Sequence, residues 1–224
     1  VSQVGWKSPK GSLPMATFLR DWSYRFPWLY RSISRAAALA VGGYERLRRL
    51  PLQGISIQPQ ERVLDLCCGP AEVTPILAEL SQNVVGLDAS PKALAAARQR
   101  LPKVEFVEAF AQDLPFPANS FDWVHTSLAL HELPFPDLEQ VLREGWRVLK
   151  PGGGLLILDL HAPCQPWMWP GLALFLALFE TETAWNLLKL DLPQYLQQQG
   201  WQSVRQTLHA GGALQVIQAQ KPAA

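Results

Sequence analysis

Two short stretches of the chain combine small and acidic residues in a pattern that suits a nucleoside ligand. In the first, an apolar run at 63–66 leads into a turn at Gly69, where the missing side chain lets the backbone approach a ligand. In the second, Asp88 ends the next apolar run, 19 positions after Gly69. A carboxylate at that spacing accepts hydrogen bonds from ribose hydroxyls. We therefore predict a nucleoside-type ligand; a glycine turn beside a helix-capping aspartate is the alternative.

The turn at Gly69 differs from that of a dinucleotide-binding protein. The dinucleotide fingerprint needs three glycines in the order G-x-G-x-x-G, whereas this stretch is Cys-Cys-Gly-Pro-Ala-Glu. Glu72 also stands near the start of the next predicted helix, where a carboxylate is expected to repel a pyrophosphate. The pattern therefore favours a nucleoside without phosphate and disfavours a nicotinamide-dependent dehydrogenase.

Strand and helix patterns alternate from about residue 60 onward, as in a parallel sheet covered by helices. Ser90 is the expected N-cap of the second helix, with Pro91 in its first turn. A Pro-Gly-Gly-Gly run is expected to end the third helix, and Gly211-Gly212 to form the turn of a final hairpin. The predicted strands are 63–66, 83–87, 104–109, 121–126, 155–159, 203–209 and 213–219. The predicted helices are 72–80, 91–101, 137–149, 171–183 and 192–199.

These elements predict an α/β fold with a doubly wound, mostly parallel seven-stranded sheet of the Rossmann-like type, closed by an antiparallel C-terminal hairpin. Residues 1–14 are interpreted as a flexible leader, with Met15 as an alternative natural start, and residues 15–58 as an N-terminal helical lid. The main domain is expected at 59–224, with an apolar insertion at 161–190.

The composition fits a packed globular protein and argues against several classes of function. Hydrophobic residues make up 48% of the 224 residues and charged residues 17%. The formal net charge of +1 gives no overall field for nucleic acid, although the first 50 residues are basic and aromatic. The three cysteines, Cys67, Cys68 and Cys164, lack the spacing of a metal site. We expect a cytoplasmic protein with neither a metal nor a nucleic-acid partner.

An apolar run at 167–179 is too short to span a bilayer but too apolar to be left in water. It has three interpretations, which the sequence leaves open. The run packs as core under the N-terminal helices, walls a pocket for a lipid-like ligand, or touches a membrane surface.

Over roughly residues 60–221 the chain resembles the class I S-adenosylmethionine-dependent methyltransferases. VLDLCCGPAEVT resembles the first motif of that family, and VVGLDAS its acidic ribose-binding motif. AFAQDLPFPANSFDWVHTSLALHEL and LREGWRVLKPGGGLLILD are similar to the regions around its later strands. The Cys-Cys-Gly variant and the D-L-P-F-P-x-N-S-F-D run most resemble the ubiquinone and menaquinone biosynthesis type. HAPCQPWMWPGLALFLALFETETAW resembles a cyanobacterial branch of uncharacterised relatives.

The resemblance implies S-adenosylmethionine as the cofactor and assigns residues to it. Asp88 is expected to hold the ribose, and Ser127 to approach the methyl end, while Asp65 organises the loop. Phe110 stands where family members often have an aspartate that accepts from the adenine amino group, which a phenyl ring cannot do. The implied cofactor-binding residues are Asp65, Cys67, Gly69, Ala71, Thr74, Asp88, Ala89, Phe110, Ala111, Gln112 and Ser127.

Methyl transfer needs an aligned nucleophile, exclusion of water and, for a phenol or a carbon acid, removal of a proton. His131 follows the fourth strand and is the predicted base. The alternative is a histidine that caps the next helix or bonds to Glu132. Asp159 and His161, at the end of the fifth strand, are further candidates for contact with the acceptor, although Asp159 also suits a structural turn.

The resemblance and the apolar insertion together predict a small, apolar, quinone-like acceptor, methylated at either carbon or oxygen. A non-catalytic cofactor-binding or membrane-surface interaction protein on the same fold is the alternative, supported by Phe110 and the altered glycines. Peripheral membrane contact is an expectation of both interpretations, and the sequence specifies no oligomeric state.

Overall fold

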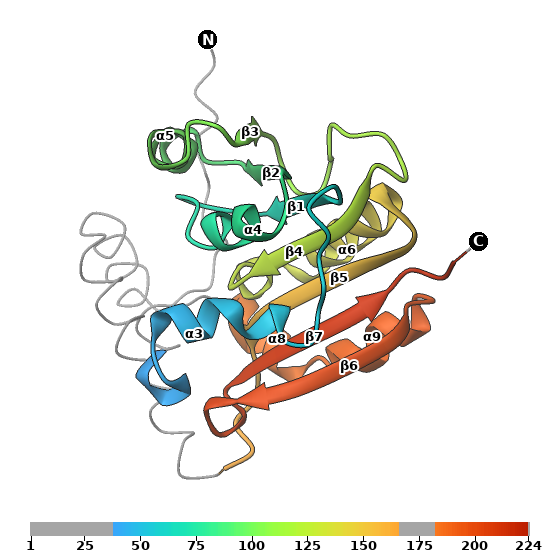
Figure 1. Ribbon diagram of the computed structural model, residues 1–224. Coiled ribbons are helices and arrows are strands. Elements are labelled where there is room, and N and C mark those ends of the chain that lie inside the picture. Colours follow the sequence, from blue (N-terminus) through green and yellow to red (C-terminus); the bar gives the residue numbers. More distant parts are fainter. Residues whose placement is uncertain (1–37, 166–181, 224) are drawn as a thin grey trace, which may run out of the picture.

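The structure is a computed structural model that describes residues 38–165 and 182–223, and a seven-stranded sheet is its centre (Figure 1). The strand order is β3-β2-β1-β4-β5-β7-β6. The first five strands in that order are parallel, whereas β7 is antiparallel to both β5 and β6. The strands are β1 (Arg62–Leu66), β2 (Asn83–Asp88), β3 (Glu105–Glu108), β4 (Phe121–Ser127), β5 (Leu149–Leu160), β6 (Gln202–His209) and β7 (Leu214–Gln220). The predicted doubly wound sheet with an antiparallel C-terminal pair is confirmed.

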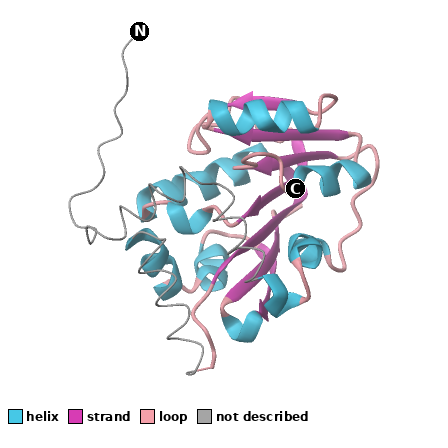
Figure 2. Cartoon of the chain, turned by 90° about the vertical axis from the view of Figure 1, so that its left-hand side faces the viewer, coloured by secondary structure: helices cyan, strands magenta, loops and turns pink. Residues whose placement is uncertain are grey.

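Helices cover both faces of the sheet, as Figure 2 shows. They are α3 (Tyr44–Arg49), α4 (Thr74–Leu80), α5 (Pro91–Arg100), α6 (Phe135–Val148), α8 (Glu182–Lys189) and α9 (Leu192–Gln198). In the part of the chain that the structure describes, four 3-10 turns accompany them: η1 (Leu39–Val41), η2 (Leu50–Leu52), η3 (Leu130–Glu132) and η5 (Ala210–Gly212). The predicted helix at 171–183, the leader and residues 15–37 of the predicted lid lie outside the described residues, apart from the last two positions of that helix, which begin α8.

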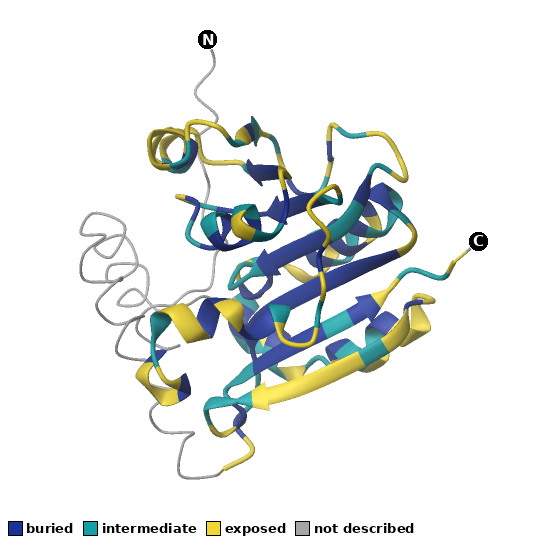
Figure 3. Ribbon diagram, in the orientation of Figure 1, coloured by how far each residue is buried: buried dark blue, intermediate teal, exposed yellow. Residues whose placement is uncertain are grey.

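Alternation along the strands assigns the helices to their faces. Leu64 packs with residues of α6, α8 and α9, whereas its neighbour Val63 packs with Leu77 of α4. On the same side as Val63, Leu47 of α3 packs near Leu158 of β5. Figure 3 shows the result: buried residues fill the central strands, and β6 at the edge is exposed.

The strand β5 begins earlier than the sequence predicts. Helix α6 ends at Val148, and residues 149–160 form one strand that includes the Pro-Gly-Gly-Gly run. Leu149 pairs with Phe121, and Gly154 pairs with Trp123 after a register shift. A side chain at Gly154 would collide with the Trp123 ring, so glycine is required by packing inside the strand. The sequence predicts this glycine run as a helix terminator; the structure adds its role inside the strand.

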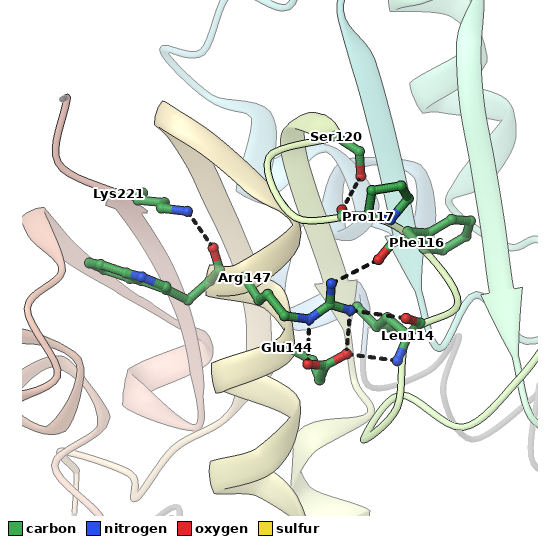
Figure 4. Close-up of polar contacts among 8 residues, drawn as sticks. Leu114, Phe116, Pro117, Ser120, Glu144, Arg147 and Lys221 are labelled. Carbon is green, nitrogen blue, oxygen red and sulfur yellow. Dashed lines mark hydrogen bonds and ion pairs between the residues drawn. The ribbon is translucent and has the colours of Figure 1, made fainter.

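Glu144 and Arg147 of α6 hold the long loop between β3 and β4 (Figure 4). Glu144 Oε2 accepts from the Leu114 backbone N–H at 2.8 Å and also pairs with Arg147. The Arg147 guanidinium donates to the carbonyls of Leu114 and Phe116 at 3.0 and 2.8 Å. This loop begins with the predicted site residues Phe110 to Gln112, and the pair holds the part of the loop that directly follows them.

No helix among residues 38–165 and 182–223 is long and apolar enough to cross a membrane.

Replacing Glu144 with glutamine is expected to lower the free energy of unfolding at pH 7 by about 2 kcal/mol, since a charge-assisted bond to Arg147 is lost. Hydrogen bonds from Arg147 hold the pKa of Glu144 below its ordinary value of 4.5. The contribution is therefore complete above that value and disappears as the pH falls through the lowered pKa. Urea unfolding of both proteins between pH 7 and 3 measures it.

Glu139→Gln is the matched control, because Glu139 forms a partly exposed helical ion pair with Arg143 at 2.9 Å, and glutamine keeps an oxygen for its hydrogen bond with Tyr195. Its cost should stay below about 0.5 kcal/mol at pH 7. A difference between wild type and Glu144→Gln that does not change with pH would contradict the assignment.

Candidate functional site

The loop that follows β1 contains residues in the left-handed backbone conformation, which glycine adopts far more readily than other residues. Cys67, Gly69 and Ala71 all lie in the left-handed region, with φ of 57°, 55° and 60°. The two non-glycine residues are strained there, and such strain persists only where the surroundings fix the backbone. At Gly69 a side chain would meet nothing within 4 Å, so the backbone faces open space that a ligand can fill.

Asp88 ties this loop to the end of β2. Its Oδ2 accepts from the Gly69 backbone N–H at 2.8 Å, and its Oδ1 accepts from the Ser90 N–H at 2.8 Å. The side chain is half-buried, and Ala89 beside it is exposed. Each carboxylate oxygen keeps a second lone pair, so Asp88 retains the capacity to accept from hydroxyl groups of a ligand. Ser90 accepts from the Ala93 N–H, which confirms it as the N-cap of α5.

Asp65 lies under the loop in a buried hydrogen-bond network. Thr74 Oγ1 donates to Asp65 Oδ2 at 2.6 Å, and His125 Nδ1 lies 2.9 Å from Asp65 Oδ1. The network links β1, the start of α4 and β4. His125 is a site residue that the sequence does not predict, because its signal is the register pairing with Asp65, which becomes visible only when β1 and β4 are neighbours.

His131 and Asp159 come together at the end of β4. His131 Nδ1 lies 2.6 Å from Asp159 Oδ1, and both side chains are buried. Asp159 also accepts from the backbone N–H groups of Ala129, Leu130 and Leu160 at 2.7 to 3.2 Å. Its carboxylate is therefore committed to holding η3 and orienting the imidazole. Because the carboxylate accepts, Nδ1 carries the proton and Nε2 is the basic nitrogen of the neutral ring.

The remaining predicted cofactor residues lie at the same edge. The Ala109 N–H donates to the Asp88 carbonyl at 3.2 Å, which places the loop after β3 beside the end of β2. In that loop Phe110 is 67% exposed, Ala111 is buried and Gln112 is half-buried. Ser127 ends β4, half-buried.

His161 lies apart from this group. Its Nδ1 donates to the Gly212 carbonyl at 2.8 Å. The ring lines a cavity of about 260 Å³ together with residues of α8, the start of α9 and β6, which are Leu188, Lys189, Leu190, Asp191 and Gln206. Its contact with an acceptor stays a prediction.

Glu72 differs from its expected role as a free carboxylate that repels phosphate. Its carboxylate accepts from Tyr44 Oη at 3.0 Å and forms an ion pair with Arg48, so its charge is compensated. A dinucleotide is therefore disfavoured by the missing glycines alone.

The fold is a doubly wound α/β sheet with its candidate site at the carboxyl edge, and comparison with known proteins identifies the family of this fold to which the chain belongs. Residues 63–153 match a family described as a methyltransferase domain. The chain is 52% identical over 205 residues to an uncharacterized methyltransferase of Synechocystis sp., with 92% of this chain and 97% of that protein aligned. It is 33% identical to a demethylmenaquinone methyltransferase of Listeria monocytogenes, over 74% of this chain and 80% of that protein.

Solved structures share the fold. An S-adenosylmethionine-dependent methyltransferase of Thermotoga maritima has a TM-score of 0.62 at 18% identity and covers 91% of this chain and 99% of its own. One from Aquifex aeolicus has a TM-score of 0.59 at 20% identity, over 83% of this chain and 97% of its own. The chain belongs to the S-adenosylmethionine-dependent methyltransferases.

The two loop thiols are expected to resist alkylation. Burial, with the nearby carboxylate of Asp88, raises the pKa of Cys67 to about 12, and burial also raises the pKa of Cys68. Only the thiolate reacts, so a pKa near 12 slows modification at pH 8 about a thousandfold relative to an ordinary thiol. Iodoacetamide should label the exposed Cys164 in the native protein and all three cysteines after denaturation, as read by peptide mass spectrometry. Labelling of native Cys67 at the rate of Cys164 would contradict the raised pKa of its thiol.

Proposed function

We propose that this protein transfers a methyl group to a small, apolar, quinol-like acceptor, with His131 as the base. The observation that carries the proposal is the meeting of three features at one edge of the sheet. These are the left-handed loop after β1, the Asp88 carboxylate at the end of β2 and the His131–Asp159 pair after β4. Ligands of open α/β sheets bind at this edge, where the strand order reverses.

The residues at this edge fit S-adenosylmethionine, which supplies a methyl group activated by a sulfonium sulfur. Asp88 keeps lone pairs for the ribose hydroxyls, and the open space at Gly69 admits a ligand against the backbone. The exposed ring of Phe110 offers a face on which adenine stacks, in place of a hydrogen bond. Asp65 and Thr74 hold the loop rather than the ligand, since they bond to each other.

On the acceptor side, His131 and Asp159 have different roles. Asp159 accepts from Nδ1 of His131, so Nε2 is the atom that takes up the proton of the acceptor. The carboxylate then stabilises the imidazolium that forms. Asp159 has no capacity left for a substrate, because backbone N–H groups occupy both of its oxygens. It is a positioning residue.

The quinol-like acceptor is supported by the relatives and by the sequence. Besides the Listeria protein, a 2-phytyl-1,4-naphtoquinone methyltransferase of Synechococcus elongatus is 34% identical over 137 residues, 58% of its length. The apolar run at 167–179 suits an acceptor of the same polarity. An acceptor of this kind resides in a membrane, so we propose a cytoplasmic protein that works at the membrane surface.

Asp88→Ala is expected to weaken binding of S-adenosylhomocysteine by about 10- to 100-fold, because two hydrogen bonds to a charged group are lost. Isothermal titration calorimetry measures the affinity for S-adenosylhomocysteine. NADH is titrated separately, as the representative of the alternative cofactor class. Glu105→Gln is the control. It removes an exposed charge from the first residue of β3, at the edge of the sheet away from the site, and should bind S-adenosylhomocysteine as wild type does. Equal affinity of Asp88→Ala and wild type would refute the ribose assignment, and binding of NADH alone would overturn the cofactor class.

His131→Ala is expected to lower kcat by about 10²- to 10⁴-fold while S-adenosylhomocysteine affinity is kept, since only proton removal is lost. The assay follows transfer of a labelled methyl group to a prenylated naphthoquinol in detergent, with a water-soluble catechol beside it. His209→Ala, on the edge strand β6, is the control. Full activity of His131→Ala would exclude it as the base. Cofactor binding without transfer to either acceptor would favour the non-catalytic alternative.

A further inference from the structure

Glu72 lies in the loop that follows β1, residues 67–73, which is called the cofactor loop below. Its side chain joins this loop to the N-terminal helix α3. Its Oε2 accepts from Tyr44 Oη at 3.0 Å and contacts the Arg48 guanidinium. Arg100, at the end of α5, lies 3.8 Å from Oε1. One carboxylate in the loop thus gathers groups from two helices that are remote in sequence.

Arg48 is an integral part of α3 packing and is 6% exposed. Its guanidinium lies 3.7 Å over the Tyr44 ring, and burial lowers its pKa. A buried cation that loses its partner is strongly destabilising, so the ion pair with Glu72 compensates a charge that would otherwise be buried alone. The neighbouring Arg49 gives the contrast, since it pairs with Glu79 at the exposed surface.

Glu72 directly follows the strained part of the loop. Ala71 is fully buried with φ of 60°, and a left-handed alanine is kept only where its neighbours hold it. Asp88 holds the loop at Gly69, and Glu72 holds its other end. Release of Glu72 would free Ala71 to relax to an ordinary conformation and change the shape of the loop.

We propose that α3 and the cofactor loop form a coupled unit, in which Tyr44 and Arg48 act on Glu72 as positioning residues for cofactor binding. Docking of α3 holds the loop in its binding conformation. Bound cofactor strengthens the docking of α3 by the same factor, because such coupling is reciprocal. The inference rests on the proposed placement of S-adenosylmethionine at this loop.

The test measures S-adenosylhomocysteine binding to the full chain by calorimetry. Arg48→Met and Tyr44→Phe should each raise the Kd about fivefold or more, the range in which such couplings fall. Arg49→Met loses only the exposed pair with Glu79 and should stay within about twofold of wild type. In wild type, the ligand should slow hydrogen exchange at amides 44–50, and Arg48→Met should lose this protection.

The outcomes separate the coupling from the function on which it rests. If wild type binds and both variants bind equally well, the coupling is overturned, even if their melting temperatures fall. If wild type does not bind, the proposed function fails instead. Tyr44→Phe keeps the ring that packs under Arg48 and removes only a hydroxyl, so it decides the question if Arg48→Met does not fold.

Discussion

The hydrogen bond from the Gly69 backbone to Asp88 determines the shape of the sheet edge on which the site depends. It joins the ends of β1 and β2 across a loop with three left-handed residues. Two of them are not glycine, and each costs about 1–2 kcal/mol relative to an ordinary backbone. The loop keeps its shape because carboxylates fix it on three sides: Asp88 at its centre, Asp65 through Thr74 beneath it, and Glu72 at its end.

Four acidic residues near this edge do different work because their surroundings differ. Asp65 and Asp159 are buried and surrounded by donors, so they orient a histidine each, His125 and His131. Asp88 is half-buried and keeps acceptor capacity toward solvent. Glu72 faces cations. A carboxylate in this fold thus keeps the capacity to accept from a ligand only where backbone N–H groups and partner side chains leave an oxygen lone pair open.

Sequence patterns predicted the sheet well because its signals are local. Apolar runs identify the strands, Ser90 and Pro91 mark the start of α5, and Gly69 and Asp88, picked out by their spacing, are hydrogen-bonded at the ends of consecutive strands. The same reasoning failed where a residue's role is set by a distant partner. The glycine run enters β5 because Gly154 must admit the Trp123 ring, a contact that no local pattern encodes.

The same limit applies to the candidate site. His131 and Asp159 were recognised separately, by their places after two strands, and only the fold brings them to 2.6 Å. His125 and the partners of Glu72 were missed because their significance depends on strand register and on the packing of α3. Residues at strand ends are predictable since topology gathers them at one edge. Residues on neighbouring elements that hold these side chains in place cannot be predicted in this way.

The edge strand β6 has a consequence for how molecules of this protein meet one another. Its pairing with β7 is interrupted between Gln202 and Arg205, where Ser203 has φ of 50°. An irregularity of this kind twists a strand and breaks the regular row of N–H and C=O groups along its free side. A second chain arriving at this edge meets a regular strand only at residues 205–209, and Arg205 adds a charge there. The bulge and the charge thus shorten the stretch of exposed edge to which a further strand could add.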